Sequence, residues 1–349
     1  MNALFIGIGT SARCWYRCAL PARALGADWI GVGGHPTALV IRTGQCTRDI
    51  GGIDDLATYD TVVLQQPHGP AWSNAIAELR RRGTRVLFEV DEDPRGAANA
   101  TDRGERTGGA SPATVHALEQ AMSACDGIIC PTRPLADALR GFNEDAWVCP
   151  NGIDLGRYAL SRTARETVTI GWAGRAAASG AAIAPWRREL EEVLASRPAT
   201  SFMSVGAEGV ASALAERFGP RRCQGLPWGP IETYPAAMSS FDIALAPAAP
   251  TTCFRSRGDL QWLEAAALAI PVVAGAALHP EIEDGVTGLL AATPAQARAA
   301  ILALVDDEGL RDRIGLAARA YVREHRCIEA VAPAWARALA GASAAAQAA

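Results

Sequence analysis

Short apolar runs rich in β-branched residues alternate with amphipathic stretches of helical periodicity along nearly the whole chain. This alternation is typical of parallel sheets that helices cover on both faces. A polar, aperiodic stretch at 156–167 divides it into two series, and 349 residues is about the length of two domains. The sequence therefore predicts an α/β protein with two doubly wound parallel-sheet domains.

Each series predicts a set of strands and helices. The first predicts strands at Ala3–Ile8, Trp29–Val32, Ala38–Ile41, Thr61–Leu64, Arg85–Val90, Gly127–Cys130 and Ala146–Cys149, and helices at Trp72–Arg82, Pro112–Ala124 and Pro134–Leu139. The second predicts strands at Val168–Trp172, Ser201–Val205, Arg222–Gln224, Ile243–Ala246 and Pro271–Val273. Its helices are expected at Trp186–Ala195, Ala207–Phe218, Thr233–Ser239, Gly258–Leu268, Pro294–Val305, Glu308–His325 and Glu329–Leu339. Ligands of such sheets bind at the carboxyl ends of the strands, which makes the cleft between the domains the expected site.

Charge and cysteine usage exclude several classes of protein. The formal charge of −4 does not suit a chain that coats nucleic acid. The sequence has no lysine, so every cationic side-chain role falls to arginine or to a protonated histidine. The nine cysteines are scattered, without zinc-site spacing, and we expect buried, reduced thiols. The chain opens directly into a strand, and its longest apolar stretch, Ala265 to Leu278, contains Pro271 and is too short for a bilayer. We expect a cytoplasmic protein without stable membrane insertion.

The first strand runs into Gly7-Ile8-Gly9-Thr10-Ser11-Ala12, a match to G-x-G-x-x-A. Such a turn is found in dinucleotide-binding folds, so an NAD(P)-dependent oxidoreductase is one alternative. A nicotinamide site also requires a carboxylate at the end of the second strand, where this chain has Gly33, Gly34 and His35. A glycine turn that lets the backbone approach another ligand fits equally well.

The segment from Phe254 to Ala274 carries the most chemical information. Ser256 and Asp259 have the spacing of a capping box, which predicts a helix start there. Arg257 and Glu264 are seven residues apart, so both lie on one face of that helix, separated by about 10 Å along its axis. An arginine at a helix N-terminus favours phosphate, and a carboxylate further along can accept hydrogen bonds from sugar hydroxyls. The alternative is a capped helix with an Arg–Glu surface face.

This segment resembles the donor-site helix of GT-B glycosyltransferases, in particular family 4-like bacterial and phage enzymes with a K-S-D-L-K-[WF]-L-E run. The resemblance extends along most of the chain: it includes Cys149–Asp154, Ile170–Arg175, Asp284–Leu290, Tyr16-Arg17 with Pro21, and Phe88–Asp93. The chain departs from the pattern at several positions. Ser256 replaces the first glutamate of the familiar pair, the lysines of the run become Arg257 and Gln261, and Ala178–Ala181 lacks the histidine that the subgroup often has there.

The resemblance implies a GT-B fold whose C-terminal helix crosses back onto the N-terminal domain. The implied boundaries are an acceptor-side domain at 1–155, a donor domain at 167–325, the returning helix at 326–340 and a frayed tail at 341–349. It further implies retaining, metal-independent transfer, with a nucleotide-diphosphate sugar as co-substrate and no cofactor.

Roles for individual residues follow from the same resemblance. Arg175, Arg257 and the helix N-terminus would replace a metal at the diphosphate, and Glu264 would bind the ribose hydroxyls. The other donor-site positions expected are Gly7, Gly9, Gly174, Pro227, Trp228, Ser256, Gly258, Asp259 and Leu260. On the acceptor side, Asp91 would position an acceptor hydroxyl, with Tyr16, Arg17 and His68 nearby. For Trp228, Asp91 and His68, ordinary packing or loop roles are the alternatives.

The donor base, the sugar and the acceptor are left open by the sequence. A saccharide, a protein, a modified nucleic-acid base or a small molecule would all suit one fold as acceptor. Because Ser256 replaces a glutamate, a catalytically inactive sugar- or nucleotide-binding protein is a third alternative.

Overall fold

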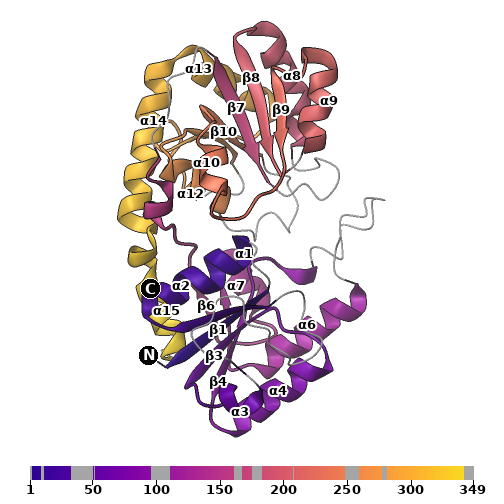
Figure 1. Ribbon diagram of the computed structural model, residues 1–349, viewed down its shortest axis with the longest axis vertical. Coiled ribbons are helices and arrows are strands. Elements are labelled where there is room, and N and C mark those ends of the chain that lie inside the picture. The colour runs from indigo at the N-terminus through magenta and orange to yellow at the C-terminus, as the bar shows by residue number, and fades with distance from the viewer. Residues whose placement is uncertain are drawn as a thin grey trace. The chain divides into compact units, whose positions relative to one another are not determined.

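The computed structural model describes residues 2–8, 12–32, 50, 52–95, 111–160, 167–174, 183–206, 208–247, 259–276 and 281–341. These residues form two compact units, each built on its own sheet (Figure 1). Unit 1 contains the described residues up to Gly152 and those from Ile328 onward, and unit 2 contains those from Ile153 to Cys327. Each unit is described below by itself.

Unit 1 has a six-stranded parallel sheet in the order β2-β1-β3-β4-β5-β6. The strands are β1 (Ala3–Ile8), β2 (Asp28–Val32), β3 (Thr61–Gln65), β4 (Arg85–Glu89), β5 (Gly127–Cys130) and β6 (Ala146–Val148). The helical elements are α1 (Ala12–Cys14), the π-helical turn η1 (Trp15–Ala19), α2 (Leu20–Leu25), α3 (Ile53–Leu56), α4 (Pro70–Arg81), α6 (Pro112–Ala124), α7 (Arg133–Leu139) and α15 (Ile328–Leu339).

Local signals explain where the helices of unit 1 begin. Ser111 caps α6 by accepting a hydrogen bond from the Thr114 amide, and Thr132 caps α7 in the same way through Leu135. Both caps are followed within two residues by a proline, whose fixed φ suits the first helical turn.

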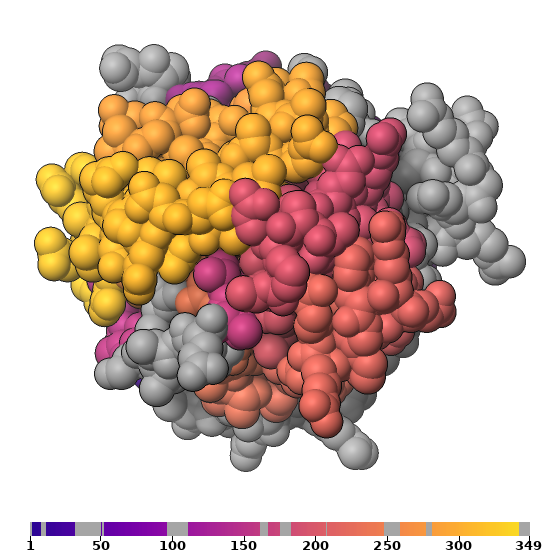
Figure 2. Space-filling view, turned by 90° about the horizontal axis from the view of Figure 1, so that it is seen from above, coloured from indigo at the N-terminus to yellow at the C-terminus, as the bar shows by residue number. Residues whose placement is uncertain are grey.

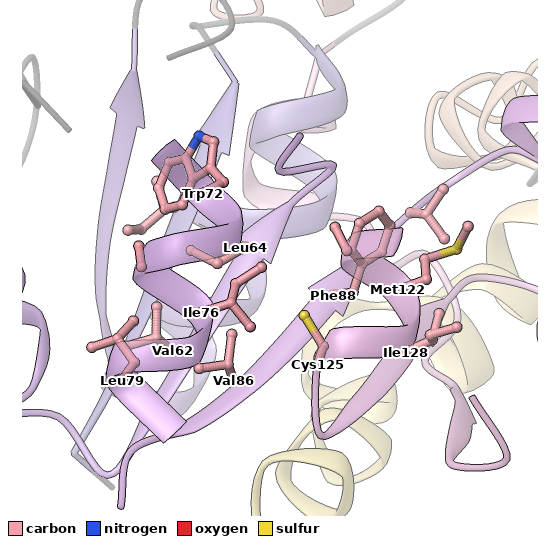
Figure 3. Packing of buried hydrophobic residues seen from close by; sticks show 14 of the residues in the cluster. Val62, Leu64, Trp72, Ile76, Leu79, Val86, Phe88, Met122, Cys125 and Ile128 are labelled. Atoms are coloured by element: carbon pink, nitrogen blue, oxygen red, sulfur yellow. The ribbon is translucent and has the colours of Figure 1, made fainter. Parts of the chain in front are cut away.

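The core of unit 1 lies between its sheet and the helices α4 and α6 (Figure 3). Strands β3, β4 and β5 contribute one side of it, with Val62, Leu64, Val86, Phe88 and Ile128. Trp72, Ile76 and Leu79 of α4 and Met122 and Cys125 of α6 pack against them. Each large apolar side chain of this kind contributes about 1.5–3 kcal/mol to the stability of the fold when it is fully buried. This packing stabilises the sheet whose carboxyl edge carries the loops described below.

Helix α15 returns to unit 1 from the far end of the chain and packs on α2 (Figure 1). Its Trp335 is fully buried, contacts the Phe5 ring at 6.1 Å between centroids, and donates a hydrogen bond to the Pro150 carbonyl at 3.4 Å. The C-terminal segment is therefore part of the structure of unit 1.

Unit 2 has a second six-stranded parallel sheet, in the order β12-β11-β10-β7-β8-β9. The strands are β7 (Val168–Ala173), β8 (Thr200–Val205), β9 (Cys223–Leu226), β10 (Ile243–Ala246), β11 (Val272–Gly275) and β12 (Leu289–Ala291). The helical elements are η3 (Leu155–Tyr158), η4 (Ala184–Trp186), α8 (Arg187–Ser196), α9 (Glu208–Phe218), α10 (Tyr234–Met238), α12 (Leu260–Ala267), α13 (Pro294–Asp306), α14 (Glu308–Tyr321) and the π-helical turn η5 (Val322–Arg326).

Ion pairs join the helices on the outer surface of unit 2. Figure 2 shows this surface, where atoms of α8 (rose) lie against those of α13 (orange) and beside those of α9 (salmon). Arg298 of α13 pairs with Glu192 of α8, and Arg197 pairs with Asp306 at 2.7 Å. Arg217 of α9 reaches Glu191 of α8 at 3.1 Å. The charged side chains of this face are thus used to hold its helices together.

The two parallel sheets confirm the predicted fold class, and the predicted strands that the structure describes agree with it to within two residues at each end. The strand expected at Ala38–Ile41 lies outside the described residues. Strand β12 was missed, because the sequence there was interpreted as a turn. The helix predicted over Glu308–His325 is α-helical only to Tyr321 and continues as a π-helical turn.

Candidate functional site

In unit 2, the predicted donor carboxylate Glu264 lies on α12 and is buried, with 5% of its surface exposed. Its neighbours on α12, from Trp262 to Ala267, are all buried, so this short helix is embedded in the unit on every side. Burying a carboxylate is costly unless hydrogen bonds compensate. The phenol of Tyr234, from α10, donates such a bond to Glu264 Oε2 at 3.0 Å.

Tyr234 is suited to this role because its proton is retained. Burial, together with the neighbouring Glu264 carboxylate, raises the pKa of Tyr234 well above its ordinary value. The phenol therefore keeps its proton at neutral pH and donates a hydrogen bond to the Glu264 carboxylate, whose position this bond helps to fix.

The ring of Trp228 lies beside the carboxyl ends of β7 and β8. It contacts the Tyr234 ring at 5.2 Å between centroids and is 38% exposed. Gly206, directly after β8, has a φ of +85°, and a Cβ there would lie 2.3 Å from Trp228 Cε3 and 3.0 Å from the Gly174 carbonyl. Only glycine allows this conformation and this close approach. Gly174, Gly206, Trp228, Tyr234 and Glu264 therefore form one contiguous group.

Two side chains of α12 attach the helix to the rest of unit 2. Gln261 Nε2 donates to the Ala173 carbonyl at the end of β7, at 2.8 Å. Trp262 Nε1 donates to the Thr287 carbonyl at 3.1 Å. Gln261 replaces a lysine of the family pattern, and here it fixes α12 against the strand that leads to Gly174.

The start of α12 differs from the prediction. The helix begins at Leu260, and Asp259, expected as the third residue of a capped first turn, instead precedes it without a side-chain capping bond. The Asp259 carboxylate pairs with Arg326 of η5 at 2.6 Å, and the same guanidinium pairs with Glu281. This ion pair joins the start of α12 to η5, and the predicted cap Ser256 lies outside the described residues.

In unit 1, an arginine–carboxylate pair lies beneath the carboxyl ends of the strands. Arg17 Nε donates to Glu89 Oε1 at 2.7 Å, and both side chains are 0% exposed. Arg17 Nη1 donates to the Cys149 carbonyl at 2.6 Å, and its guanidinium lies 4.5 Å from the centre of the Trp335 ring. Arg17 is therefore an internal tie among η1, β4 and α15.

Gly7 has a packing role in the same region. A Cβ at this position would lie 2.3 Å from Cys14 Sγ and 3.2 Å from Cys18 Cβ. The absence of a side chain lets α1 and η1 press against β1, which brings the arginines of this helical segment to the end of the sheet. The predicted approach of Gly7 to a donor stays a prediction, whereas its close contact with the helix explains the glycine.

Asp91 and His68 lie in the loops after β4 and β3. Asp91 pairs with Arg13 of α1 at 2.8 Å and is 23% exposed. His68 is half-buried, with its Nδ1 3.1 Å from the Gln66 carbonyl. Arg13 Nη1 in turn donates to Gln66 Oε1 at 3.3 Å, so one arginine links the two loops.

The structure groups some predicted site residues and separates others. Gly174, Trp228 and Glu264 come together, while Pro227 is exposed and Leu260 and Asp259 lie at the start of α12. Tyr16 and Arg17 were predicted to contact an acceptor, but both are buried inside unit 1, so we correct their role to a structural one. Outside the described residues lie Gly9, Arg175, Ser256, Arg257 and Gly258.

Several residues of these groups were not predicted. Gly206 had a signal, since a glycine directly after an apolar strand indicates a turn with positive φ. Arg13 also had one, because it precedes Arg17 by one helical turn. Tyr234 had none, because only the folded chain brings it to Glu264.

The described residues contain no group of three His, Cys, Asp or Glu side chains arranged to hold a metal ion. In the described part of the chain, every helix falls short of the length or the apolarity that crossing a membrane requires.

Residues 167–307 match the family model "Glycosyl transferases group 1". Among curated proteins, none matches the chain. Unit 2 thus contains a glycosyl transferase group 1 domain, and on this match the chain is a glycosyltransferase. The match favours a glycosyltransferase over a nicotinamide-dependent oxidoreductase, the alternative suggested by the glycine motif at Gly7–Ala12.

Solved structures with the same fold include HepE of Anabaena in complex with UDP and glucose (TM-score 0.65, 15% identity, 97% of this chain and 99% of that one). Sucrose-phosphate synthase of Thermosynechococcus elongatus has a TM-score of 0.67 and 14% identity, over 97% of this chain and 98% of that one. TarM of S. aureus, in complex with fondaparinux, alpha-GlcNAc-glycerol and UDP, has a TM-score of 0.59 and 16% identity over 82% of this chain. The aligned region is 58% of the TarM chain. These similarities assign the GT-B fold to the chain.

Proposed function

We propose that this glycosyltransferase moves a sugar from a nucleotide-diphosphate donor to an acceptor hydroxyl, with retention of anomeric configuration and without a metal. The observation that carries the proposal is the glycosyl transferase group 1 match over the unit that contains Glu264. The complexes of HepE and TarM with UDP support a nucleotide-diphosphate donor for this chain as well.

The donor group of unit 2 has the chemistry that such a ligand requires. Glu264, oriented by the Tyr234 phenol, accepts hydrogen bonds from the ribose hydroxyls. The half-exposed Trp228 ring next to it provides an apolar surface for the nucleotide base. Gly206, which has no side chain, lets the Trp228 ring pack closely against the ends of β7 and β8 beside this group.

The diphosphate gains negative charge as the sugar leaves, and positive groups aimed at it lower the barrier. We assign this role to Arg175 and Arg257 and to the N-terminal end of the donor helix, as the resemblance implies. Retention and metal independence rest on the same resemblance. We propose a nucleotide sugar as the co-substrate and no further cofactor. We also propose a cytoplasmic location.

A thermal-shift panel of UDP-, GDP-, ADP- and dTDP-sugars tests donor binding, and release of the nucleotide diphosphate tests turnover. We expect one donor class to raise the melting temperature of the wild-type protein. Glu264→Gln should lose most of that shift, because an amide accepts ribose hydroxyls less well than a carboxylate. Glu192→Gln, at an exposed ion pair on the outer surface of unit 2, should keep it.

If no donor raises the melting temperature, the donor site is wrongly assigned. If a donor binds but is neither transferred nor hydrolysed, the catalytically inactive alternative is correct. Activity that is retained in EDTA, and a product with the anomeric configuration of the donor by NMR, are expected. Loss of activity in EDTA with recovery on adding a divalent cation would contradict metal independence.

A further inference from the structure

Two arginines on one helical segment of unit 1 face two carboxylates at the end of one strand. Arg13 and Arg17 are four residues apart, a rise of about 6 Å along an α-helix. Glu89 and Asp91 are two residues apart, about 6.6 Å along a strand. The spacings match, so Arg17 pairs with Glu89 at 2.7 Å while Arg13 pairs with Asp91 at 2.8 Å.

The two pairs differ in exposure. The inner pair is completely buried and tied to the Cys149 carbonyl, so it fixes the segment to the sheet. In the outer pair, Arg13 is 34% exposed and Asp91 is 23% exposed. The outer pair therefore lies at the surface of unit 1, whereas the Glu89 side chain is closed to solvent.

All three nitrogens of the Arg13 guanidinium contact side chains of unit 1. Its Nε forms an ion pair with Asp91 Oδ2 at 2.8 Å. Its Nη2 donates to Glu92 Oε1 at 2.8 Å, and its Nη1 donates to Gln66 Oε1 at 3.3 Å. A planar guanidinium presents its donors in fixed directions, so these bonds set the orientation of the Asp91 carboxylate relative to the β3 and β4 loops.

The loop held by Arg13 is strained. Gln66 has a φ of +45°, in the left-handed region that favours glycine. The residue is 9% exposed, and its backbone N–H donates to the Glu89 carbonyl at 3.0 Å. Backbone strain of this kind is concentrated at functional sites, where the surrounding contacts maintain it. The strained backbone of Gln66 and the three contacts of the Arg13 guanidinium thus lie at the same edge of the sheet.

We propose that Arg13 is a positioning residue of the acceptor site: it holds Asp91 so that its carboxylate accepts a hydrogen bond from the acceptor hydroxyl. The proposal rests on the proposed glycosyl transfer. Arg13 touches neither substrate in this role, and its contribution is made through the orientation of Asp91.

The test compares Arg13→Ala and Arg13→Lys with Arg80→Ala in steady-state transfer, varying donor and acceptor separately. Arg80 is a matched control, because it pairs with Asp126 at the same 2.8 Å but at the opposite, amino edge of the sheet. We expect Arg13→Ala to lower kcat/KM for the acceptor by roughly tenfold to a hundredfold, since misplacing a positioned group by about 1 Å has effects of this size. The donor KM, the rate of donor hydrolysis by water and the melting temperature should stay close to those of Arg80→Ala.

Two comparisons separate positioning from general damage to unit 1. Arg13→Lys should recover only part of the activity, because an ammonium does not reproduce the planar fork. Guanidinium ion added at low millimolar concentration should partly restore Arg13→Ala and leave Arg80→Ala unchanged.

An equal loss in donor hydrolysis and transfer, or acceptor kinetics indistinguishable from those of Arg80→Ala, would overturn the positioning role while leaving the proposed function intact. A wild-type protein that transfers no sugar would overturn both.

Discussion

Removing Arg17 while keeping Glu89 tests how unit 1 is held together. Both side chains are fully buried, and the guanidinium also bonds the Cys149 carbonyl and lies over Trp335. In Arg17→Met, the Glu89 carboxylate keeps its bond from Gln65 Nε2 at 2.9 Å but loses its opposite charge. Breaking one side of a buried ion pair costs about 3–5 kcal/mol, whereas replacing both partners by apolar residues is close to neutral or stabilising.

For a unit of this size, about 3–5 kcal/mol corresponds to roughly 6–20 °C in melting temperature. Because the chain has two units, hydrogen exchange of β3 and β4 peptides should accompany the thermal scan, so that the loss is assigned to unit 1. The double variant Arg17→Met with Glu89→Leu should recover most of the loss. A single variant that costs less than about 1 kcal/mol, or a double variant that is as unstable as the sum of both singles, would refute the reasoning.

The effect of pH gives an independent test of the same pair. Burial raises the pKa of Glu89 above its ordinary value of 4.5, although Arg17 acts in the opposite direction. The native state then binds a proton more readily than the unfolded chain, so this contribution to stability is complete below 4.5 and is lost as pH rises through the native pKa. Without Arg17 the pKa rises further. The cost of Arg17→Met should therefore be smaller at pH 5 than at pH 8, and a cost independent of pH would contradict this assignment.

Three further predictions concern single positions. Gly206→Ala should destabilise unit 2 by about 2 kcal/mol and weaken donor binding, because it adds a clash with Trp228 to left-handed backbone strain. Gly219→Ala is the control, since Gly219 has the same φ of +85° but no neighbour within 4 Å of an added Cβ. In a thermal scan this control should show the cost of the backbone strain alone. Gln261→Met should cost about 1–2 kcal/mol by leaving the Ala173 carbonyl without its donor, and equal donor affinity and stability to wild type would contradict it. Burial raises the pKa of Cys14 to about 12, so iodoacetamide at pH 8 should label this thiol only after unfolding, as mass spectrometry of digests would show.

Most of the fold was predictable because the strands are parallel and buried on both faces. Such strands appear in sequence as continuous apolar runs, and β3 and β10 are buried along their whole length. Strand β12 lacks this signal, since it has three residues and two of them are half-buried. The π-helical turn η5 was predicted as the end of an α-helix, because its buried residues Val322 and Arg326 are four apart, a spacing that also fits the α-helical period.

The candidate sites were predictable only where a function depends on spacing within one segment. Glu264 could be proposed from the residues around it on α12, and its donor role stays a prediction. The roles of Tyr16 and Arg17 could not be identified in this way, because the same short motif is compatible with an exposed binding residue and with a buried residue that links structural elements. Tyr234, Gln66 and Asp259 take their roles from partners distant in sequence, and no local pattern encodes those pairings.

The contrast between the two units supports assigning them different chemistry. In unit 1, arginines compensate the carboxylates: Arg17 pairs with Glu89, and Arg13 pairs with Asp91. A guanidinium fixes a carboxylate but also neutralises its charge, which suits a group that must stay in place and accept one modest hydrogen bond from a neutral hydroxyl. In unit 2, a phenol orients Glu264. A hydrogen bond from a neutral phenol weakens the acceptor strength of a carboxylate less than a charge-assisted bond from a guanidinium does. This difference in partner agrees with the proposed roles, in which Glu264 binds the ribose and Asp91 orients an acceptor hydroxyl.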